Sequence, residues 1–308
     1  MTTDTLRPLD LSGVYTALIT PFTRDGWVDE AALADLIEYQ IESGVSGLVP
    51  CGTTGESPTL SHAEHDHVVD FTVRQAAGRV PVIAGTGSNS TAEAIQLSQH
   101  AEMSGVDGVL LISPYYNKPT QKGLYQHFRA VAEAVNIPVV LYNIQGRTAV
   151  NIETPTLVRL AQDCHNIVGV KEASGSLEQM SGVIEQRLPG FQVVSGDDNM
   201  VLDLLELGGH GVISVASNVI PAQMAELVRL ARAGQQAEAR ALEATLEPFF
   251  RACFCETNPI PIKTALAEYG WCEETFRLPM TTLEDEAHRE QLLDALRPLD
   301  VRRRTQDA

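Results

Sequence analysis

Short apolar runs rich in β-branched residues recur along this chain, and a segment of helical periodicity follows each of them. Eight such runs lie at residues 13–21, 47–51, 80–85, 108–113, 138–143, 167–171, 191–195 and 211–216. Parallel strands with helical crossovers give this alternation, because a parallel sheet needs a long connection between neighbouring strands. Eight such units in about 230 residues predict an α/β fold with a closed (β/α)8 TIM barrel rather than an open doubly wound sheet.

The last part of the chain has a different pattern. From residue 235 onward only helical segments follow, so we expect a barrel domain at residues 1–233 and a C-terminal helical domain at residues 234–308. The glycine pattern of a dinucleotide-binding fold is also missing from the sequence, because Gly85-Thr86-Gly87 lacks the third glycine.

Capping residues stand at the starts of several predicted helices. Asp29 precedes an Ala- and Leu-rich segment, and Thr154 precedes a proline at the first helical position. Ser61 and Ser90 each have a glutamate three residues later, which is the pattern of a capping box. Local chemistry and periodicity therefore predict the same helices.

Composition limits the partners of the chain. A formal net charge of −18 argues against nucleic acid and against an anionic membrane surface, because no basic excess is available to neutralise phosphates. The five cysteines are scattered and form no CxxC pair, which indicates reduced thiols in the cytoplasm. No basic leader and no apolar stretch of about 18 residues is visible in the sequence, so we expect a soluble protein.

Lys171 ends the apolar run 167–170, where a charged amine has no obvious structural use. Burial there would lower its pKa towards neutrality and turn the free amine into a nucleophile. Schiff-base chemistry is one interpretation of this position. The other is a lysine whose amine reaches solvent or pairs with Glu172.

Other polar residues follow the strands at the same predicted edge, where barrel enzymes place their active sites. They lie at residues 52–57, 114–117, 142–143, 147, 195–198 and 211–214. A Schiff-base enzyme needs an amine, a proton relay and donors for a substrate carboxylate, and this set offers each kind of group. Gly52 and Gly55 suit a tight loop whose N–H groups approach a carboxylate, although an ordinary polar turn has the same composition.

Several motifs together resemble the dihydrodipicolinate synthase and N-acetylneuraminate lyase family. They are Gly52-Thr53-Thr54-Gly55-Glu56-Ser57, Pro114-Tyr115-Tyr116-Asn117-Lys118-Pro119, Tyr142-Asn143 with Arg147-Thr148, Gly169-Val170-Lys171-Glu172-Ala173 and Ser195-Gly196-Asp197-Asp198. The resemblance covers nearly the whole chain in the expected order, including residues 258–263 and 277–280. It implies a lyase that condenses pyruvate with L-aspartate 4-semialdehyde to 4-hydroxy-tetrahydrodipicolinate, the first committed step of diaminopimelate and lysine biosynthesis.

The resemblance also implies catalytic roles. Lys171 would form the Schiff base with pyruvate, and Tyr142 would relay protons to and from it. Thr53 would link Tyr142 to Tyr116, which in this family reaches in from a neighbouring subunit. The implied assembly is therefore a homo-oligomer, a tetramer built as a dimer of dimers, and the implied chemistry requires no organic cofactor and no metal.

The substrate-binding residues implied by the resemblance are Thr54, Gly196 and Ile213 for pyruvate and Arg147 for the carboxylate of the aldehyde. The planar guanidinium of Arg147 suits bidentate binding of a carboxylate. This chain has Gln145 where the family has a proline, which leaves the position of the Arg147 loop open. A lyase of keto-deoxy sugar acids or sialate therefore stays as an alternative, as does a non-catalytic sensor on the same barrel.

A second set of residues resembles the family's allosteric lysine site at a subunit interface. It consists of Ser57, His62, His65, Asn89, Glu93 and Tyr115, and Pro58 departs from the usual alanine. The histidines at 62, 65 and 67 also suggest a metal site, but only His62 and His65 share a helix face, so we expect no metal. Asp197 and Asp198 are expected to cap a helix, and Cys253 and Cys255 to be buried thiols.

Overall fold

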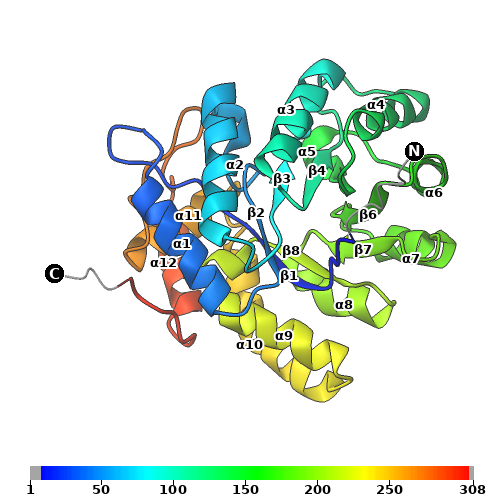
Figure 1. Ribbon diagram of the computed structural model, residues 1–308. Helices are drawn as coiled ribbons and strands as arrows, with labels where there is room; N and C mark the ends of the chain where they lie inside the picture. Colours follow the sequence, from blue (N-terminus) through cyan, green and yellow to red (C-terminus); the bar gives the residue numbers. More distant parts are fainter. Residues whose placement is uncertain (1–7, 305–308) are drawn as a thin grey trace.

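The computed structural model describes residues 8–304, and its centre is a sheet of eight parallel strands. The strands are β1 (Gly13–Ala17), β2 (Gly47–Val49), β3 (Ile83–Gly85), β4 (Gly108–Ile112), β5 (Val139–Asn143), β6 (Ile167–Glu172), β7 (Gln192–Ser195) and β8 (Gly211–Ser214). Neighbours pair in the order β2-β1-β8-β7-β6-β5-β4-β3, and a parallel bridge between Leu48 and Val82 joins the two ends. The predicted (β/α)8 barrel is therefore confirmed (Figure 1).

Helices surround this barrel, and further helices come after it in the sequence (Figure 1). The α-helices are α1 (Glu30–Glu42), α2 (His62–Ala76), α3 (Thr91–Ser104), α4 (Gln121–Glu133), α5 (Gln145–Thr148), α6 (Thr154–Asp163), α7 (Leu177–Gln186), α8 (Val201–Glu206), α9 (Pro221–Arg232), α10 (Gln236–Ala252), α11 (Ile260–Glu268) and α12 (Glu286–Leu296). Three 3-10 turns, η1 (Ser57–Thr59), η2 (Asp198–Met200) and η3 (Ala216–Asn218), follow β2, β7 and β8.

The side chains of each strand divide between two apolar layers. In β5, Val140 and Tyr142 belong to a cluster inside the barrel, whereas Val139 and Leu141 belong to the larger cluster between strands and helices. Successive side chains of a strand point to opposite faces, so the register fixes which residues face the interior. Lys171 pairs with Tyr142 across β5 and β6, and its side chain therefore shares the inner layer.

Seven of the eight strands are shorter than the sequence pattern indicates, and β6 extends one residue further, to Glu172. The run 13–21 ends as a strand at Ala17, because Asn218 takes over the backbone groups beyond it. Its side-chain amide donates to the Ala17 carbonyl at 2.8 Å and accepts from the Ile19 N–H at 3.1 Å. The run 211–216 likewise ends as a strand at Ser214, and η3 begins two residues later, at Ala216.

Two of the predicted caps are confirmed and two are wrong. Asp29 caps α1, and Ser61 forms the full capping box of α2. Ser90 makes no cap hydrogen bond, because the glutamate that would complete its box binds His62 and Ser88 instead. Thr154 is the first residue of α6 rather than its cap.

The C-terminal helices pack directly against the barrel and do not form a separate body. Helix α10 contacts α9, α12 and η2, and α11 contacts η3 near the carboxyl end of β8.

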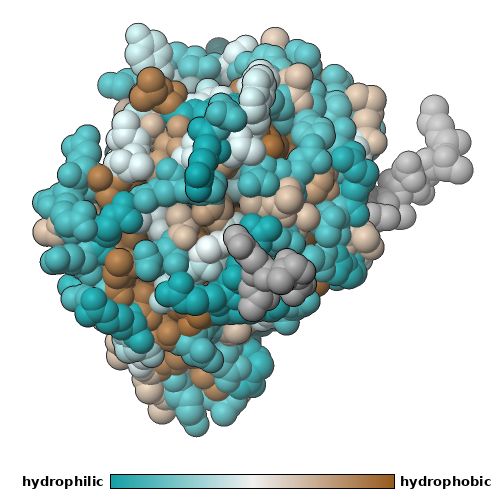
Figure 2. Space-filling model, turned by 90° about the vertical axis from the view of Figure 1, so that its left-hand side faces the viewer, coloured by the Kyte–Doolittle hydropathy of each residue, from teal (hydrophilic) through white to brown (hydrophobic). Residues whose placement is uncertain are grey.

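Hydrophilic residues cover most of the face shown in Figure 2, with hydrophobic residues in smaller patches between them. The domain boundary between residues 233 and 234 stays a prediction. Within residues 8–304, no helix is both long and apolar enough to cross a membrane.

Candidate active site

Lys171 is buried at the carboxyl end of β6, and its Nζ lies 4.3 Å from the centre of the Tyr142 ring. Burial lowers the pKa of Lys171 to about 8, although the charges of Asp197 and Asp198 oppose this shift. At that pKa a substantial part of the amine is neutral near pH 7 to 8 and can act as a nucleophile.

The alternative interpretation of Lys171, an ion pair with the next residue, is wrong. Glu172 faces the opposite side of β6, where Asn143 Nδ2 donates to its Oε2 at 3.1 Å and the Ser174 N–H to its Oε1 at 2.8 Å. Gln179 Nε2 donates to it as well, at 3.0 Å. The alternation of the strand separates the two charges, so Lys171 keeps a free amine inside the barrel.

The absence of a side chain at Gly196 leaves room for Lys171. A Cβ atom at this glycine would lie 2.9 Å from Lys171 Cε and 2.5 Å from Ala173 Cβ, which is closer than such atoms approach. A side chain at this position would therefore displace the lysine. The glycine belongs to a cavity of about 30 Å³ that also contains Lys171 and Asp197 in its wall.

Tyr142 lies beside Lys171 at the end of β5. Burial raises the pKa of its phenol, and a hydrogen bond with Thr53 opposes that rise. The phenol therefore stays protonated at neutral pH. Tyr142, Thr53 and Lys171 line the same cavity, which gives the amine a neighbouring hydroxyl that can donate and accept protons.

Thr54 and Arg147 are connected through a residue from the C-terminal segment. Asn258 Nδ2 donates to Thr54 Oγ1 at 2.9 Å, and Arg147 Nη2 donates to the Asn258 carbonyl at 3.1 Å. All three residues line the cavity of Lys171. Asn258 was not predicted as a site residue, although it lies in a motif that carries the family resemblance.

The structure brings together six of the eight predicted catalytic and substrate-binding residues around this cavity. They are Lys171, Tyr142, Thr53, Thr54, Arg147 and Gly196. Ile213 is fully buried inside the barrel and does not line it. Tyr116 is 88% exposed, has a left-handed backbone, and does not line the cavity.

Gln145 stands at the start of the short helix that carries Arg147. It is the first residue of α5, and the N–H at that helix position has no partner within the helix. Proline and glutamine are therefore both accommodated there.

The two adjacent aspartates do not act as the expected helix caps. Asp198 Oδ2 accepts from the N–H groups of Val215 at 3.1 Å and Ala216 at 2.8 Å, so it joins the end of β7 to the end of β8. Asp197 makes no cap hydrogen bond and faces the lysine cavity. The sequence pattern did not indicate Asp197 as a site residue, because two adjacent aspartates before a helix usually cap that helix.

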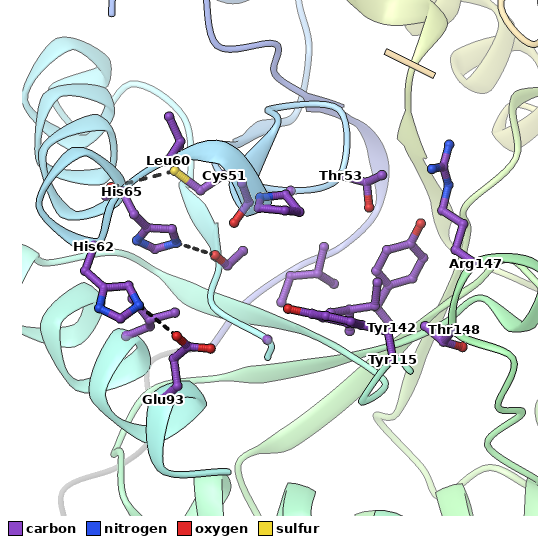
Figure 3. Close-up of a pocket in the computed structure, with 18 residues that line it drawn as sticks. Cys51, Thr53, Leu60, His62, His65, Glu93, Tyr115, Tyr142, Arg147 and Thr148 are labelled. Atoms are coloured by element: carbon purple, nitrogen blue, oxygen red, sulfur yellow. Dashed lines mark hydrogen bonds and ion pairs between the residues drawn. The ribbon is translucent and has the colours of Figure 1, made fainter. Parts of the chain in front are cut away.

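A larger cavity of about 390 Å³ lies next to the first (Figure 3). It contains five of the six residues predicted for the lysine site, namely Ser57, His62, His65, Glu93 and Tyr115. Asn89 is not part of its wall, and its carbonyl accepts from Asn117 Nδ2. Thr53, Tyr142 and Arg147 stand on the opposite side in Figure 3.

Its histidines are held by hydrogen bonds. His62 Nε2 lies 2.7 Å from Glu93 Oε1, and His65 Nε2 lies 2.8 Å from the Gly85 carbonyl. Hydrogen bonds from Ser88 and His62 lower the pKa of Glu93, so it carries a negative charge. No group of three or more metal-ligating side chains is found within residues 8–304.

The cysteines are all free thiols. Cys253 is buried, as predicted, whereas Cys255 is only half-buried.

Known proteins resemble this chain over almost its whole length. The model of the dihydrodipicolinate synthetase family matches residues 10–298. A relative from Syntrophus aciditrophicus, named 4-hydroxy-tetrahydrodipicolinate synthase, is 56% identical over 280 residues, which are 91% of this chain and 95% of the relative. The crystal structure of dihydrodipicolinate synthase from Aquifex aeolicus has a TM-score of 0.93 at 45% identity and covers 96% of this chain and 100% of its own.

Two further solved structures contain small molecules. The chloride-inhibited dihydrodipicolinate synthase from Acinetobacter baumannii, complexed with pyruvate, has a TM-score of 0.90 at 45% identity and covers 93% of this chain and 98% of its own. The enzyme from Cyanidioschyzon merolae with lysine bound has a TM-score of 0.90 at 42% identity and covers 92% of this chain and 97% of its own. The match extends through the barrel and the C-terminal helices, and the chain therefore belongs to the dihydrodipicolinate synthetase family.

Proposed function

We propose that this protein condenses pyruvate with L-aspartate 4-semialdehyde to 4-hydroxy-tetrahydrodipicolinate through an imine on Lys171. Family membership and the shared name of the curated relatives support this activity, and the chain is a lyase of that family. The observation that carries the residue assignment is the buried amine of Lys171 with its lowered pKa beside the Tyr142 phenol. This arrangement suits a class I aldolase, which needs no organic cofactor and no metal.

The reaction follows from the neutral amine. Lys171 Nζ attacks the keto carbon of pyruvate, and the resulting carbinolamine loses water to form the imine. Loss of a methyl proton gives the enamine, whose carbon attacks the aldehyde carbon of the second substrate, and the aldehyde oxygen takes up a proton. The amine of the bound adduct then attacks the imine carbon, closes the ring and displaces Lys171, which restores the free enzyme.

Protons in these steps pass through hydroxyl groups. Burial keeps the Tyr142 phenol protonated, so it can donate to the carbinolamine oxygen and recover a proton through Thr53. Tyr116 continues this relay when a second copy of the chain supplies it, and its exposed ring suits such a contact. The proposal therefore includes a homo-oligomer, with the tetramer built as a dimer of dimers.

The two substrates carry carboxylates that need separate donors. The hydroxyl and backbone of Thr54 suit the pyruvate carboxylate, and Gly196 forms part of the surrounding wall, whereas Ile213 does not line this cavity. The Arg147 guanidinium suits the carboxylate of the aldehyde, because its planar fork matches two oxygen atoms. Asn258 connects these donors, since it contacts both Thr54 and Arg147.

The larger cavity is proposed to bind L-lysine as an inhibitor. The lysine-bound structure from Cyanidioschyzon merolae supports this assignment. The carboxylate of Glu93 suits an ammonium group, and His62 and Tyr115 offer polar groups to the rest of an amino acid. Ser57 and His65 complete the proposed site, whereas Asn89 lies outside the cavity wall.

We also propose a cytoplasmic location, which the five free thiols and the biosynthetic reaction support. The proposed division of the chain is a catalytic barrel at residues 1–233 and a C-terminal helical domain at residues 234–308.

The imine on Lys171 is tested with borohydride in the presence of pyruvate. We expect the reduced adduct on the peptide that contains Lys171, located by mass spectrometry. Lys171→Met should give no adduct, whereas Lys122→Met, which removes an exposed lysine on α4, should leave trapping unchanged. An adduct on a different lysine, or none in the parent protein, would contradict the mechanism.

The pH dependence of trapping follows from the pKa of the amine. Because only the neutral amine attacks, the rate at limiting pyruvate should rise with pH and level off above about 8. The Asp197 charge raises this pKa, so Asp197→Asn should move the inflection to lower pH. The control Asp294→Asn changes an exposed carboxylate on α12 and should leave the inflection in place. An inflection near the ordinary lysine value would show that the amine is not desolvated.

Arg147 is tested through its effect on the second substrate. Arg147→Ala should raise the KM for L-aspartate 4-semialdehyde by about 100-fold, as expected for the loss of a charged hydrogen-bonded contact. Trapping of pyruvate should stay within about twofold of the parent. Arg159→Ala, which removes an exposed arginine on α6, serves as control. An unchanged KM for the aldehyde would place its carboxylate elsewhere.

Inhibition by lysine is tested in steady-state assays with millimolar L-lysine. We expect inhibition of the parent protein, and Glu93→Gln should weaken it by about tenfold through loss of an ammonium contact. His67→Ala is the control, because His67 of α2 also pairs with a glutamate, Glu30 of α1, but lies outside the cavity. Flat activity across this lysine range would remove the proposed site.

A further inference from the structure

A fully buried ion pair links the barrel to the C-terminal helices. Lys263 Nζ lies 2.6 Å from Glu56 Oε1, and their side chains are 0% and 1% exposed. Burying two charges costs desolvation energy that their attraction often fails to recover, so an apolar pair of similar size gives equal or greater stability. Fold stability alone therefore does not account for this pair.

The carboxylate belongs to the loop that carries the proposed catalytic threonines. Glu56 stands two residues after Thr54, and its N–H donates to the Thr53 carbonyl at 3.1 Å. Its backbone is left-handed, with a φ of 53°, a conformation that a residue with a side chain adopts with strain. The loop therefore holds a tight turn at the position where the ion pair anchors it.

The lysine belongs to a segment that holds the same loop at a second point. Asn258, five residues before Lys263, donates from Nδ2 to Thr54 Oγ1 at 2.9 Å. Helix α11 begins between them at Ile260 and gives the segment a rigid geometry. The C-terminal segment thus contacts the loop at two points, Thr54 and Glu56, which are two residues apart.

The surroundings of the pair exclude water and fix its geometry. Lys263 Nζ lies 4.1 Å from the centre of the Phe22 ring and 5.1 Å from that of Phe276. The remaining carboxylate oxygen of Glu56 accepts from the Arg277 N–H at 3.4 Å. Burial lowers the pKa of Lys263, and the attraction of Glu56 opposes this shift. The amine has one carboxylate and two ring faces as its neighbours, so its position is closely defined.

We propose that the buried Glu56–Lys263 pair is a positioning device for the reaction, which holds the Thr53–Thr54 loop in the geometry that binds pyruvate and relays protons. This inference rests on the proposed function, because it assigns Thr53 and Thr54 to the pyruvate half of the reaction. Glu56 and Lys263 contact no substrate themselves. Arg147, which acts on the second substrate, lies outside this loop, so loss of the pair should affect the two substrates differently.

The test is the double variant Glu56→Gln with Lys263→Met. It removes both charges at similar side-chain volume, and the amide oxygen keeps an acceptor for the Arg277 N–H. We expect a folded protein by circular dichroism and thermal melting, with a pyruvate KM about tenfold higher and slower borohydride trapping at limiting pyruvate. The KM for L-aspartate 4-semialdehyde should stay within about twofold of the parent.

A matched control separates positioning from general stability. Leu246→Ala removes a buried side chain of α10, a helix that packs on α9, α12 and η2, and so weakens the C-terminal packing. It should leave the pyruvate KM unchanged. A rise equal to that of the double variant would overturn the inference, as would a folded double variant with parental pyruvate KM, or equal rises for both substrates.

Two further outcomes are decisive. If the double variant does not fold, Glu56→Asp replaces it, because aspartate tolerates the left-handed backbone but its carboxylate is one methylene short of Lys263. The pyruvate KM of Glu56→Asp should then rise about threefold, and a parental value would overturn the inference. Trapping in the parent protein separates the two proposals. No adduct there would refute the Schiff-base mechanism, whereas an adduct with unchanged variants would refute only the positioning role.

Discussion

Desolvation of the Lys171 amine is the constraint on which the rest of the site depends. Burial lowers its pKa to about 8, and the charges of Asp197 and Asp198 limit the shift, so the amine can both attack and become protonated again. This balance depends on strand adjacency. The ends of three neighbouring strands place Tyr142, Lys171 and the two aspartates together, and Gly196 leaves room for the lysine stem.

The barrel alone does not complete the site. The loop after β2 is held from outside by the C-terminal segment, through Asn258 on Thr54 and Lys263 on Glu56. Thr53 of this loop borders both cavities, and Ser57 just beyond it borders the larger one. A short stretch of backbone therefore forms part of the catalytic cavity and of the neighbouring cavity, and its conformation is relevant to both.

Local signals in the sequence predict the barrel and the edge at which polar residues gather, whereas the role of each site residue is implied by the family resemblance. Alternating apolar runs predict strands and crossovers, and residues at strand ends meet at one edge whatever the detailed packing. Ser90 and Asp198 show where this reasoning fails. Each has a local pattern typical of a helix cap, yet Glu93 contacts His62, and Asp198 accepts from the backbone directly after β8. Contacts between distant segments, including that of Asn258, leave no periodic trace in the sequence.

The acidic composition of the chain and its anionic substrates are compatible for a physical reason. At physiological ionic strength, charges separated by more than about 8 Å in water are largely screened, so a formal net charge of −18 acts weakly on a ligand inside the barrel. Several carboxylates are also paired at the surface, as Glu38 is with Arg79 and Asp203 with Arg240. Inside the cavity, the electric fields of nearby charges are less screened than they are in water. In the proposed function, the few groups close to the substrate carboxylates therefore select them, above all the Arg147 guanidinium and the hydroxyl of Thr54.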